Sequence, residues 1–170
     1  MVHLSEDNLQ ARASYLRTLL TDAIGDFSGN RYLAVGTGTG KNIATLSEGY
    51  REKHTVDVVK RDPPEVADQF AIGDGTLLPY QDDTFDLITA ISVIEHVLPP
   101  ERRPNLVREM ARCTAPGGHI MFQIPNHRFV IELHSGLPFI QWLPWENEIA
   151  ALLGYDNVGD IHIPSPGRLR

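Results

Sequence analysis

The chain has 170 residues, of which 42% are hydrophobic and 22% charged, and its formal net charge is −7. This composition is typical of a globular protein with one core, and the acidic balance disfavours a nucleic-acid-binding surface. The sequence contains neither a membrane-spanning apolar run nor a signal-peptide pattern, so we expect a single-domain, cytoplasmic protein with no membrane partner.

The first half of the chain alternates helical and strand patterns. An amphipathic helix is predicted over residues 6–24, after a cap-like serine, because apolar residues recur there at helical spacing: Leu9, Leu16, Leu19, Leu20 and Ile24. A short apolar strand at residues 31–35 leads into a glycine-rich turn and a second helix at 42–50. Three further apolar runs are typical of buried parallel strands: 55–59, 70–72 and 85–91.

Only about ten residues separate the predicted second and third strands, so any helix around residues 65–69 must be very short. A third long helix is predicted over residues 101–114 and ends at Pro116-Gly117-Gly118. A fifth strand follows at residues 119–124. The alternation of strands and helices favours an α/β sheet.

Two further features are the single cysteine and the change of composition in the last part of the chain. Cys113 lies in an amphipathic segment, and a buried or half-buried thiol is favoured over a reactive one. Beyond residue 126 the composition changes to proline, aromatic and histidine residues, with one helix predicted at 146–153 and one short strand at 160–163.

Three alternating glycines form the turn after the first strand, in the run Gly36-Thr37-Gly38-Thr39-Gly40. Such a turn lets the backbone approach a ligand closely, next to the amides of a helix N-terminus. The run does not match the dinucleotide-binding motif, because Lys41 stands where that motif has glycine or alanine. It does not match the P-loop either, which needs glycine at the position of Val35 and serine or threonine at the position of Asn42. A structural turn without a ligand and a nicotinamide-binding domain remain open.

Several motifs around and after this turn share the order of one family: Leu33–Gly40, Val56-Asp57-Val58, Gly73-Asp74-Gly75, Leu78-Pro79-Tyr80, Asp82–Ile88, Val93–Val97 and Pro116-Gly117-Gly118. On these motifs, residues 32–126 resemble the core of class I S-adenosylmethionine-dependent methyltransferases, in a small "type 11-like" subgroup. The resemblance implies a Rossmann-like, three-layer α/β/α sandwich with a mostly parallel sheet. The single domain would comprise an N-terminal helix (1–30), a cofactor-binding core (31–126) and a cap or C-terminal segment (127–170).

The resemblance also implies S-adenosylmethionine as the cofactor. Asp57 follows Gly40 by 17 residues, a spacing suited to a helix and a return strand, and its carboxylate would accept hydrogen bonds from the ribose. A solvated strand-end aspartate, or Asp62 in its place, is the alternative. Asp74 would accept the adenine amino group, unless it is an ordinary turn aspartate. The predicted cofactor-binding set is Gly36, Thr37, Gly38, Gly40, Asp57, Val58, Asp74, Gly75, Thr76, Leu77, Ile91 and Ser92.

Methyl transfer from a sulfonium is an in-line displacement, and it needs a general base only where the acceptor is protonated. His96 and His134 are candidate bases, with a packed or capping histidine as the alternative for each; His127 and Glu132 are weaker candidates. No compact histidine pair with acidic partners occurs at ligand spacing, so no metal site is predicted.

The chain departs from the family pattern at two places. Ala34 stands where the family usually has an acidic residue that anchors the glycine turn or contacts the methionine amino group. At most one strand is available after residue 124, so the C-terminal strand region is expected to be truncated. Residues 127–170 would cover the core, cap a substrate or form a homodimer contact.

The predicted function is therefore methyl transfer from S-adenosylmethionine to an unidentified acceptor, with a small molecule favoured. The alternative is a catalytically weak or inactive S-adenosylmethionine-binding protein that serves as a binding or assembly module.

Overall fold

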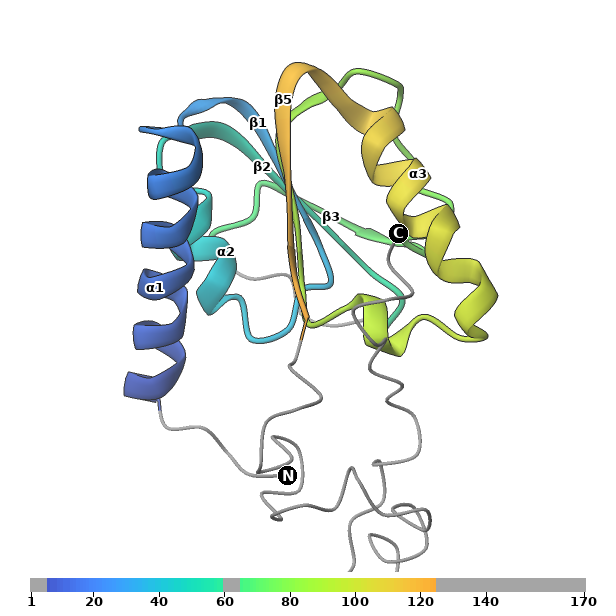
Figure 1. Ribbon diagram of the computed structural model, residues 1–170, viewed down its shortest axis with the longest axis horizontal. Helices are drawn as coiled ribbons and strands as arrows, with labels where there is room; N and C mark the ends of the chain where they lie inside the picture. The colour runs from blue at the N-terminus through green and yellow to red at the C-terminus, as the bar shows by residue number, and fades with distance from the viewer. Residues whose placement is uncertain (1–5, 60–64, 125–170) are drawn as a thin grey trace, which may run out of the picture.

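The computed structural model describes residues 6–59 and 65–124. Five parallel strands form one sheet in the order β3-β2-β1-β4-β5. Helices α1 and α2 cover one face of this sheet and α3 covers the other, so the described residues form the predicted three-layer α/β/α sandwich (Figure 1). The elements in chain order are α1 (Glu6–Ile24), β1 (Gly29–Val35), α2 (Lys41–Leu46), β2 (Tyr50–Asp57), β3 (Gln69–Ile72), β4 (Phe85–Ile91), the 3-10 turns η1 (Ile94–His96) and η2 (Pro100–Arg102), α3 (Arg103–Cys113) and β5 (Thr114–Gln123).

Alternation along β1 supplies both faces of the sheet with apolar side chains. Tyr32 and Ala34 pack with Leu16 and Leu20 of α1 in one core cluster. Leu33 and Val35, on the other face of the strand, pack in the cluster under α3. Burying a leucine side chain stabilises a fold by roughly 1.5–3 kcal/mol, so these contacts fix α1 on the sheet. The predicted bounds of α1 are confirmed, but Leu19 points to solvent, since its side chain is 42% exposed.

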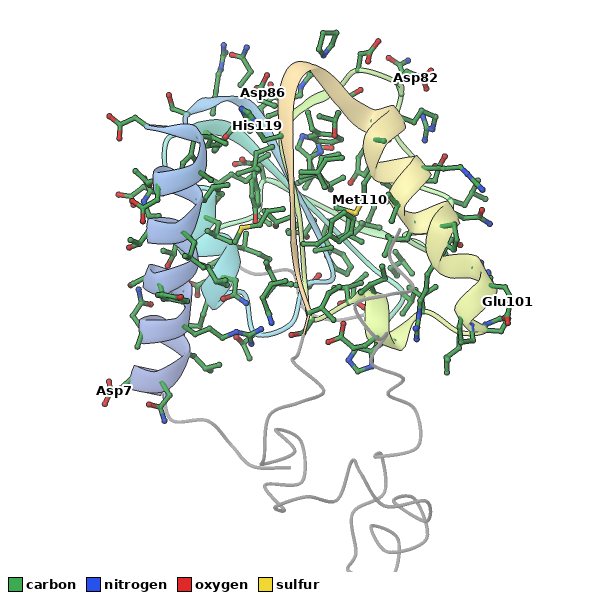
Figure 2. The ribbon with its side chains drawn as sticks, viewed as in Figure 1. Asp7, Asp82, Asp86, Glu101, Met110 and His119 are labelled. Carbon is green, nitrogen blue, oxygen red and sulfur yellow. The ribbon has the colours of Figure 1, made fainter. Side chains whose placement is uncertain are left out.

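The core under α3 contains Leu106, Met110 and Cys113, each completely buried. Figure 2 shows Met110 between α3 and the sheet. The predicted burial of Cys113 is confirmed. This helix begins two residues later than predicted, because a 3-10 turn over Pro100–Arg102 precedes it.

The predicted boundary between α2 and β2 was wrong. Helix α2 ends at Leu46, and Tyr50 begins β2 instead of ending the helix. Gly49, at φ +93°, breaks the helical path, and the Tyr50 ring packs 5.8 Å from the ring of Tyr32. Strand β2 then ends at Asp57, two residues before the predicted end.

Strand β5 also begins earlier than predicted, at Thr114, and it includes the run Pro116-Gly117-Gly118. The pairing with β4 shifts register between Phe85 and Leu87, and such an irregularity accommodates a proline that lacks a backbone donor. Residues 65–68 form a turn and no helix before β3, which agrees with the very short crossover expected there.

Several predictions lie outside the described residues: Ser5 as a helix cap, Asp62, His127, Glu132, His134, the helix at 146–153 and the strand at 160–163. Where the chain is described, none of its helices combines the length and the apolar character needed to cross a membrane.

Candidate functional site

The glycine turn leaves β1 at the sheet edge where the parallel strands end. Gly36, Gly38 and Gly40 all have positive φ, at +83°, +53° and +78°, in the region that side chains disfavour. A Cβ on Gly36 would also overlap the side chain of Val93, whereas a Cβ on Gly38 would meet nothing within 4 Å. The turn therefore needs its glycines for conformation, and at Gly36 for space as well.

Asp57, the last residue of β2, holds this turn from the side. Its Oδ2 accepts a hydrogen bond of 3.0 Å from the Thr37 backbone N–H, and its Oδ1 accepts one of 3.0 Å from Val59 N–H. The Gly36 N–H donates to the Val56 carbonyl at 2.8 Å, so the turn and the end of β2 form one unit. Asp57 thus links the turn and the segment after β2 through both of its carboxylate oxygens.

Asp74 lies in the turn after β3 and is held by three donors. Its Oδ1 accepts from the backbone N–H and the hydroxyl of Thr76, both at 2.8 Å, and its Oδ2 accepts from Arg102 Nη2 at 2.6 Å. Partial burial raises the pKa of the Asp74 carboxyl, but the hydrogen bonds from Thr76 and Arg102 outweigh this and hold the pKa below its usual value. Asp74 is thus an ionised acceptor at neutral pH.

A cavity of about 590 Å³ opens between these groups, at the carboxyl ends of the strands. Ligands of open α/β sheets bind at this edge, where the strand order reverses between β1 and β4. Eight of the predicted cofactor-binding residues line the cavity: Gly36, Gly38, Asp57, Val58, Asp74, Gly75, Ile91 and Ser92.

The other four predicted residues are not among those that line the cavity. Thr37 donates to Asp57 through its backbone, Gly40 is the N-cap of α2, and Thr76 holds Asp74. Leu77 is 76% exposed and projects from the turn after Asp74. Among the described residues, no group of three or more side chains is arranged to hold a metal ion.

We call the region of Asp57 and Asp74 the β2–β3 end of the cavity, and the region of Ser92 the β4–β5 end. Ser92 has a left-handed backbone, with φ +53°, and its amide donates to the Gln123 carbonyl at 2.9 Å. Arg12 of α1 donates through Nη2 to Ser92 Oγ at 2.8 Å and to Gln123 Oε1. Helix α1 is thereby joined to the ends of β4 and β5.

The segment after Ser92 carries a candidate base and a buried acid. His96, in η1, lines the cavity and is exposed. Its neighbour Glu95 is completely buried, and its carboxylate charge acts on Arg12 and Arg103. Burial lowers the pKa of the Arg103 guanidinium, which donates to the Glu95 carbonyl at 3.0 Å.

Three residues of this site were missed by the sequence reasoning: Arg12, Arg102 and Gln123. Arg12 is separated from Ser92 by 80 positions and from Gln123 by 111, and no local pattern indicates such a contact. The adjacent arginines at positions 102 and 103 were a visible signal, but their charge alone did not connect them with Asp74. Arg102 now lines the cavity and Arg103 lies buried beneath η1.

The arrangement suits a nucleoside. The β2–β3 end offers fixed carboxylates for hydroxyl and amino groups, and the glycine turn gives a backbone surface that side chains would block. Exposed valines at positions 58 and 59 add apolar rim to the same end. These features fit the adenosine half of S-adenosylmethionine.

A family profile described as "Methyltransferase domain" matches residues 8–158. The match begins inside α1 and includes every strand of the sheet.

Curated relatives and solved structures have methyltransferase names. A demethylmenaquinone methyltransferase of Renibacterium salmoninarum is 35% identical over 118 residues, which are 65% of this chain and 48% of that protein. "Probable tRNA methyltransferase 9B" of mouse is 35% identical over 56% of this chain and 23% of its own length. The chain thus spans about half or less of the length of these relatives. The N-methyltransferase NodS of Bradyrhizobium japonicum, solved with S-adenosyl-L-homocysteine, has the same fold, with a TM-score of 0.58, 19% identity, and coverage of 71% of this chain and 64% of that one.

Proposed function

The chain belongs to the S-adenosylmethionine-dependent methyltransferases of class I, and from this premise we propose that it transfers the methyl group of S-adenosylmethionine to a small-molecule acceptor. One observation carries the proposal: the glycine turn, Asp57 and Asp74 surround a single cavity at the switch point of the sheet. Because the chain spans only part of its relatives' length, the activity of the whole protein is part of this proposal.

The residues of the chain would act mainly by binding and orientation. S-adenosylmethionine supplies an already activated methyl group, and the protein must hold it in line with the acceptor. Asp57 would accept hydrogen bonds from the ribose, and Asp74 would accept one from the adenine amino group. The glycines of the turn would let the backbone contact the cofactor, since Gly36 and Gly38 line the cavity.

His96 is the candidate base among the described residues. It lines the cavity next to Val97 and Leu98, on the side of the cavity that η1 covers. In that position it would accept a proton from an acceptor hydroxyl or amine as the methyl group is transferred. His134, outside the described residues, remains the second candidate.

Two features support a small-molecule acceptor. The formal net charge of −7 disfavours the phosphate backbone of a nucleic acid, although one relative is named as a tRNA methyltransferase. The rim of the cavity next to His96 includes the exposed apolar side chain of Leu98, which suits an apolar acceptor surface. A cytoplasmic location and a homodimer through residues 127–170 belong to the same proposal.

Ala34 supports a second candidate function, that of a cofactor-binding protein with weak or no methyl transfer. This side chain is 3% exposed and packs in the core cluster of α1, so no acidic group reaches the glycine turn from this position. A chain that binds the cofactor without using its methyl group would act as a binding or assembly module.

Calorimetry with S-adenosylhomocysteine tests the binding that both functions share. We expect micromolar affinity, and no binding at high micromolar ligand would remove both functions. Release of S-adenosylhomocysteine from S-adenosylmethionine across a panel of quinols, amines, hydroxylated small molecules and tRNA then separates them. Turnover with one small-molecule class supports the enzyme, and binding without turnover on any class supports the module.

A further inference from the structure

Arg102, at the end of η2, is the single arginine or lysine among the described residues that line the cavity. Its Nη2 donates to Asp74 Oδ2 and to Thr76 Oγ1, both at 2.6 Å. Its side chain is nearly half exposed, so it belongs to the rim of the cavity and not to the core. Arg102 thus brings a positive charge to the β2–β3 end, next to the carboxylate that is proposed to accept the adenine amino group.

The direction of each hydrogen bond between these three side chains is fixed by their chemistry. A guanidinium only donates and an ionised carboxylate only accepts, so the Thr76 hydroxyl must donate to Asp74 Oδ1 and accept from Arg102. Both acceptor positions of Asp74 Oδ1 are then used, by the hydroxyl and the backbone N–H of Thr76. Among the described residues, Asp74 Oδ2 accepts one hydrogen bond, so it has one acceptor position left for a ligand.

Arg102 also has donors that these contacts do not use. The two hydrogens of Nη2 go to Asp74 and Thr76, and the guanidinium carries three more, on Nη1 and Nε. Within residues 6–59 and 65–124, these three have no protein acceptor. The guanidinium is a rigid, planar fork, so its unused donors lie close to Asp74 Oδ2. The β2–β3 end of the cavity thus offers an acceptor next to a donor.

An acceptor next to a donor is complementary to one edge of adenine. Adenine has its 6-amino group, a donor, beside the ring nitrogen N7, an acceptor, and side-chain amides read this edge of DNA by pairing with both atoms. Asp74 and Arg102 together offer the same two kinds of group. A ring with C–H in place of N7 would leave the donor of Arg102 without a partner.

We propose that Arg102 is a specificity-determining residue that donates a hydrogen bond to adenine N7, while Asp74 accepts one from the 6-amino group. This inference rests on the proposed binding of S-adenosylmethionine. It gives Arg102 a contact with the ligand in addition to the support that it gives Asp74. Thr76 would orient this contact, because with both hydrogens of Nη2 bonded the plane of the guanidinium is held in place.

The test compares S-adenosylhomocysteine with its 7-deaza analogue, in which C–H replaces N7. Calorimetry on the full chain should give about three- to fivefold tighter binding of S-adenosylhomocysteine, a modest ratio because solvent screens the exposed guanidinium. Arg102→Met, whose side chain has no N–H donor, should bring the ratio of the two affinities close to one. A residue that only supported Asp74 would weaken both ligands equally and leave the ratio unchanged.

A second ligand and a second variant provide the controls. The 1-deaza analogue keeps N7, so Arg102→Met should weaken it and S-adenosylhomocysteine by the same factor. Arg108→Met should keep the wild-type 7-deaza ratio, because Arg108 bonds only Asn105 among the described residues.

The outcomes separate this inference from the proposed function. An unchanged 7-deaza ratio in Arg102→Met, or a ratio that changes for the 1-deaza analogue instead, overturns the inference and leaves the proposed function intact. Failure of the wild-type chain to bind S-adenosylhomocysteine overturns both. Should Arg102→Met fail to fold, a wild-type 7-deaza ratio near one still overturns the inference.

Discussion

The two ends of the cavity are built in different ways. At the β2–β3 end, Asp57 and Asp74 each accept a hydrogen bond from a backbone amide two residues away, that of Val59 and that of Thr76, beside the bonds from Thr37 and Arg102. At the β4–β5 end, Ser92 is held by side chains from α1 and β5, far away in the sequence. The first end depends on local turns and the second on packing of the whole domain, so substitutions should affect them differently.

The largest effect is expected at the turn that joins the two ends. Gly36→Ala places a Cβ against Val93 and forces a side chain into a left-handed backbone conformation. The turn must shift, and a strain of about 1–3 kcal/mol corresponds to a loss of affinity of up to roughly 100-fold. Calorimetry should show that loss for S-adenosylhomocysteine.

Gly25→Ala provides the control for Gly36→Ala. Gly25 has nearly the same φ, +80°, but its Cβ would meet nothing within 4 Å, and it lies after α1. It should lower the thermal midpoint without changing the affinity. Equal losses of affinity in the two variants would mean that backbone strain, and not the shape of the turn, controls binding.

The next effect tests the β2–β3 end alone. Asp57→Asn removes the negative charge that holds Thr37 and Val59, and it replaces one acceptor by a donor. The affinity for S-adenosylhomocysteine should fall about tenfold, the cost of a charge-assisted hydrogen bond.

Asp68→Asn is the matched variant for Asp57→Asn. Asp68 accepts a hydrogen bond of 2.8 Å from Lys53 N–H, between the same two strands but away from the cavity. We expect no change in affinity from it. Equal losses of affinity in Asp57→Asn and Asp68→Asn would mean that the pairing of β2 and β3, and not the carboxylate at the cavity, controls binding.

The smallest effect is expected from Arg102→Gln. The pair with Asp74 is about half exposed, at 45% and 41%, so its contribution is screened by solvent and the affinity should fall only two- to fivefold, for a pair worth about 0–1 kcal/mol. Arg108→Gln serves as the comparison, because Arg108 bonds only Asn105 among the described residues.

The same variant has a predicted pH dependence. The pKa of Asp74 lies below its usual value, so the stabilisation that it contributes is present above the usual pKa and is lost as pH falls through the lowered one. Arg102→Gln removes one of the groups that lower this pKa. The acid loss of binding should therefore begin at a higher pH in the variant, and carbon-detected NMR of the Asp74 carboxyl measures the shift directly.

Much of the fold could be predicted because it depends on local patterns. The bounds of α1 and β4 follow from helical spacing and a continuous apolar run. The errors came where tertiary packing decides: Tyr50 fits the apolar spacing of α2, yet it stacks beside Tyr32 as the first residue of β2. Likewise, the run from Pro116 reads as a helix stop but forms part of β5, at an irregularity in its pairing with β4.

The residues of the site also divide into those that local patterns predict and those that only tertiary packing brings together. Asp57, Asp74 and the glycine turn could be identified from their order along the chain, and the two aspartates line the cavity together with Gly36 and Gly38. Arg12 and Gln123 could not, because nothing in their own neighbourhoods distinguishes them from surface residues of an ordinary helix and strand. Arg102 was visible as a charge, but its partner Asp74 is defined only by the path of the chain through η2.

The contact of Arg12 with Gln123 has a consequence for how the protein acquires its site during folding. The 111 positions between the two residues make this one of the longest closures in the described chain, and its entropic cost must be met before the contact forms. The turns around Asp57 and Asp74 close over a few residues and need no such encounter. A folding chain would thus complete the β4–β5 end of the cavity only when the first helix docks on the last described strand.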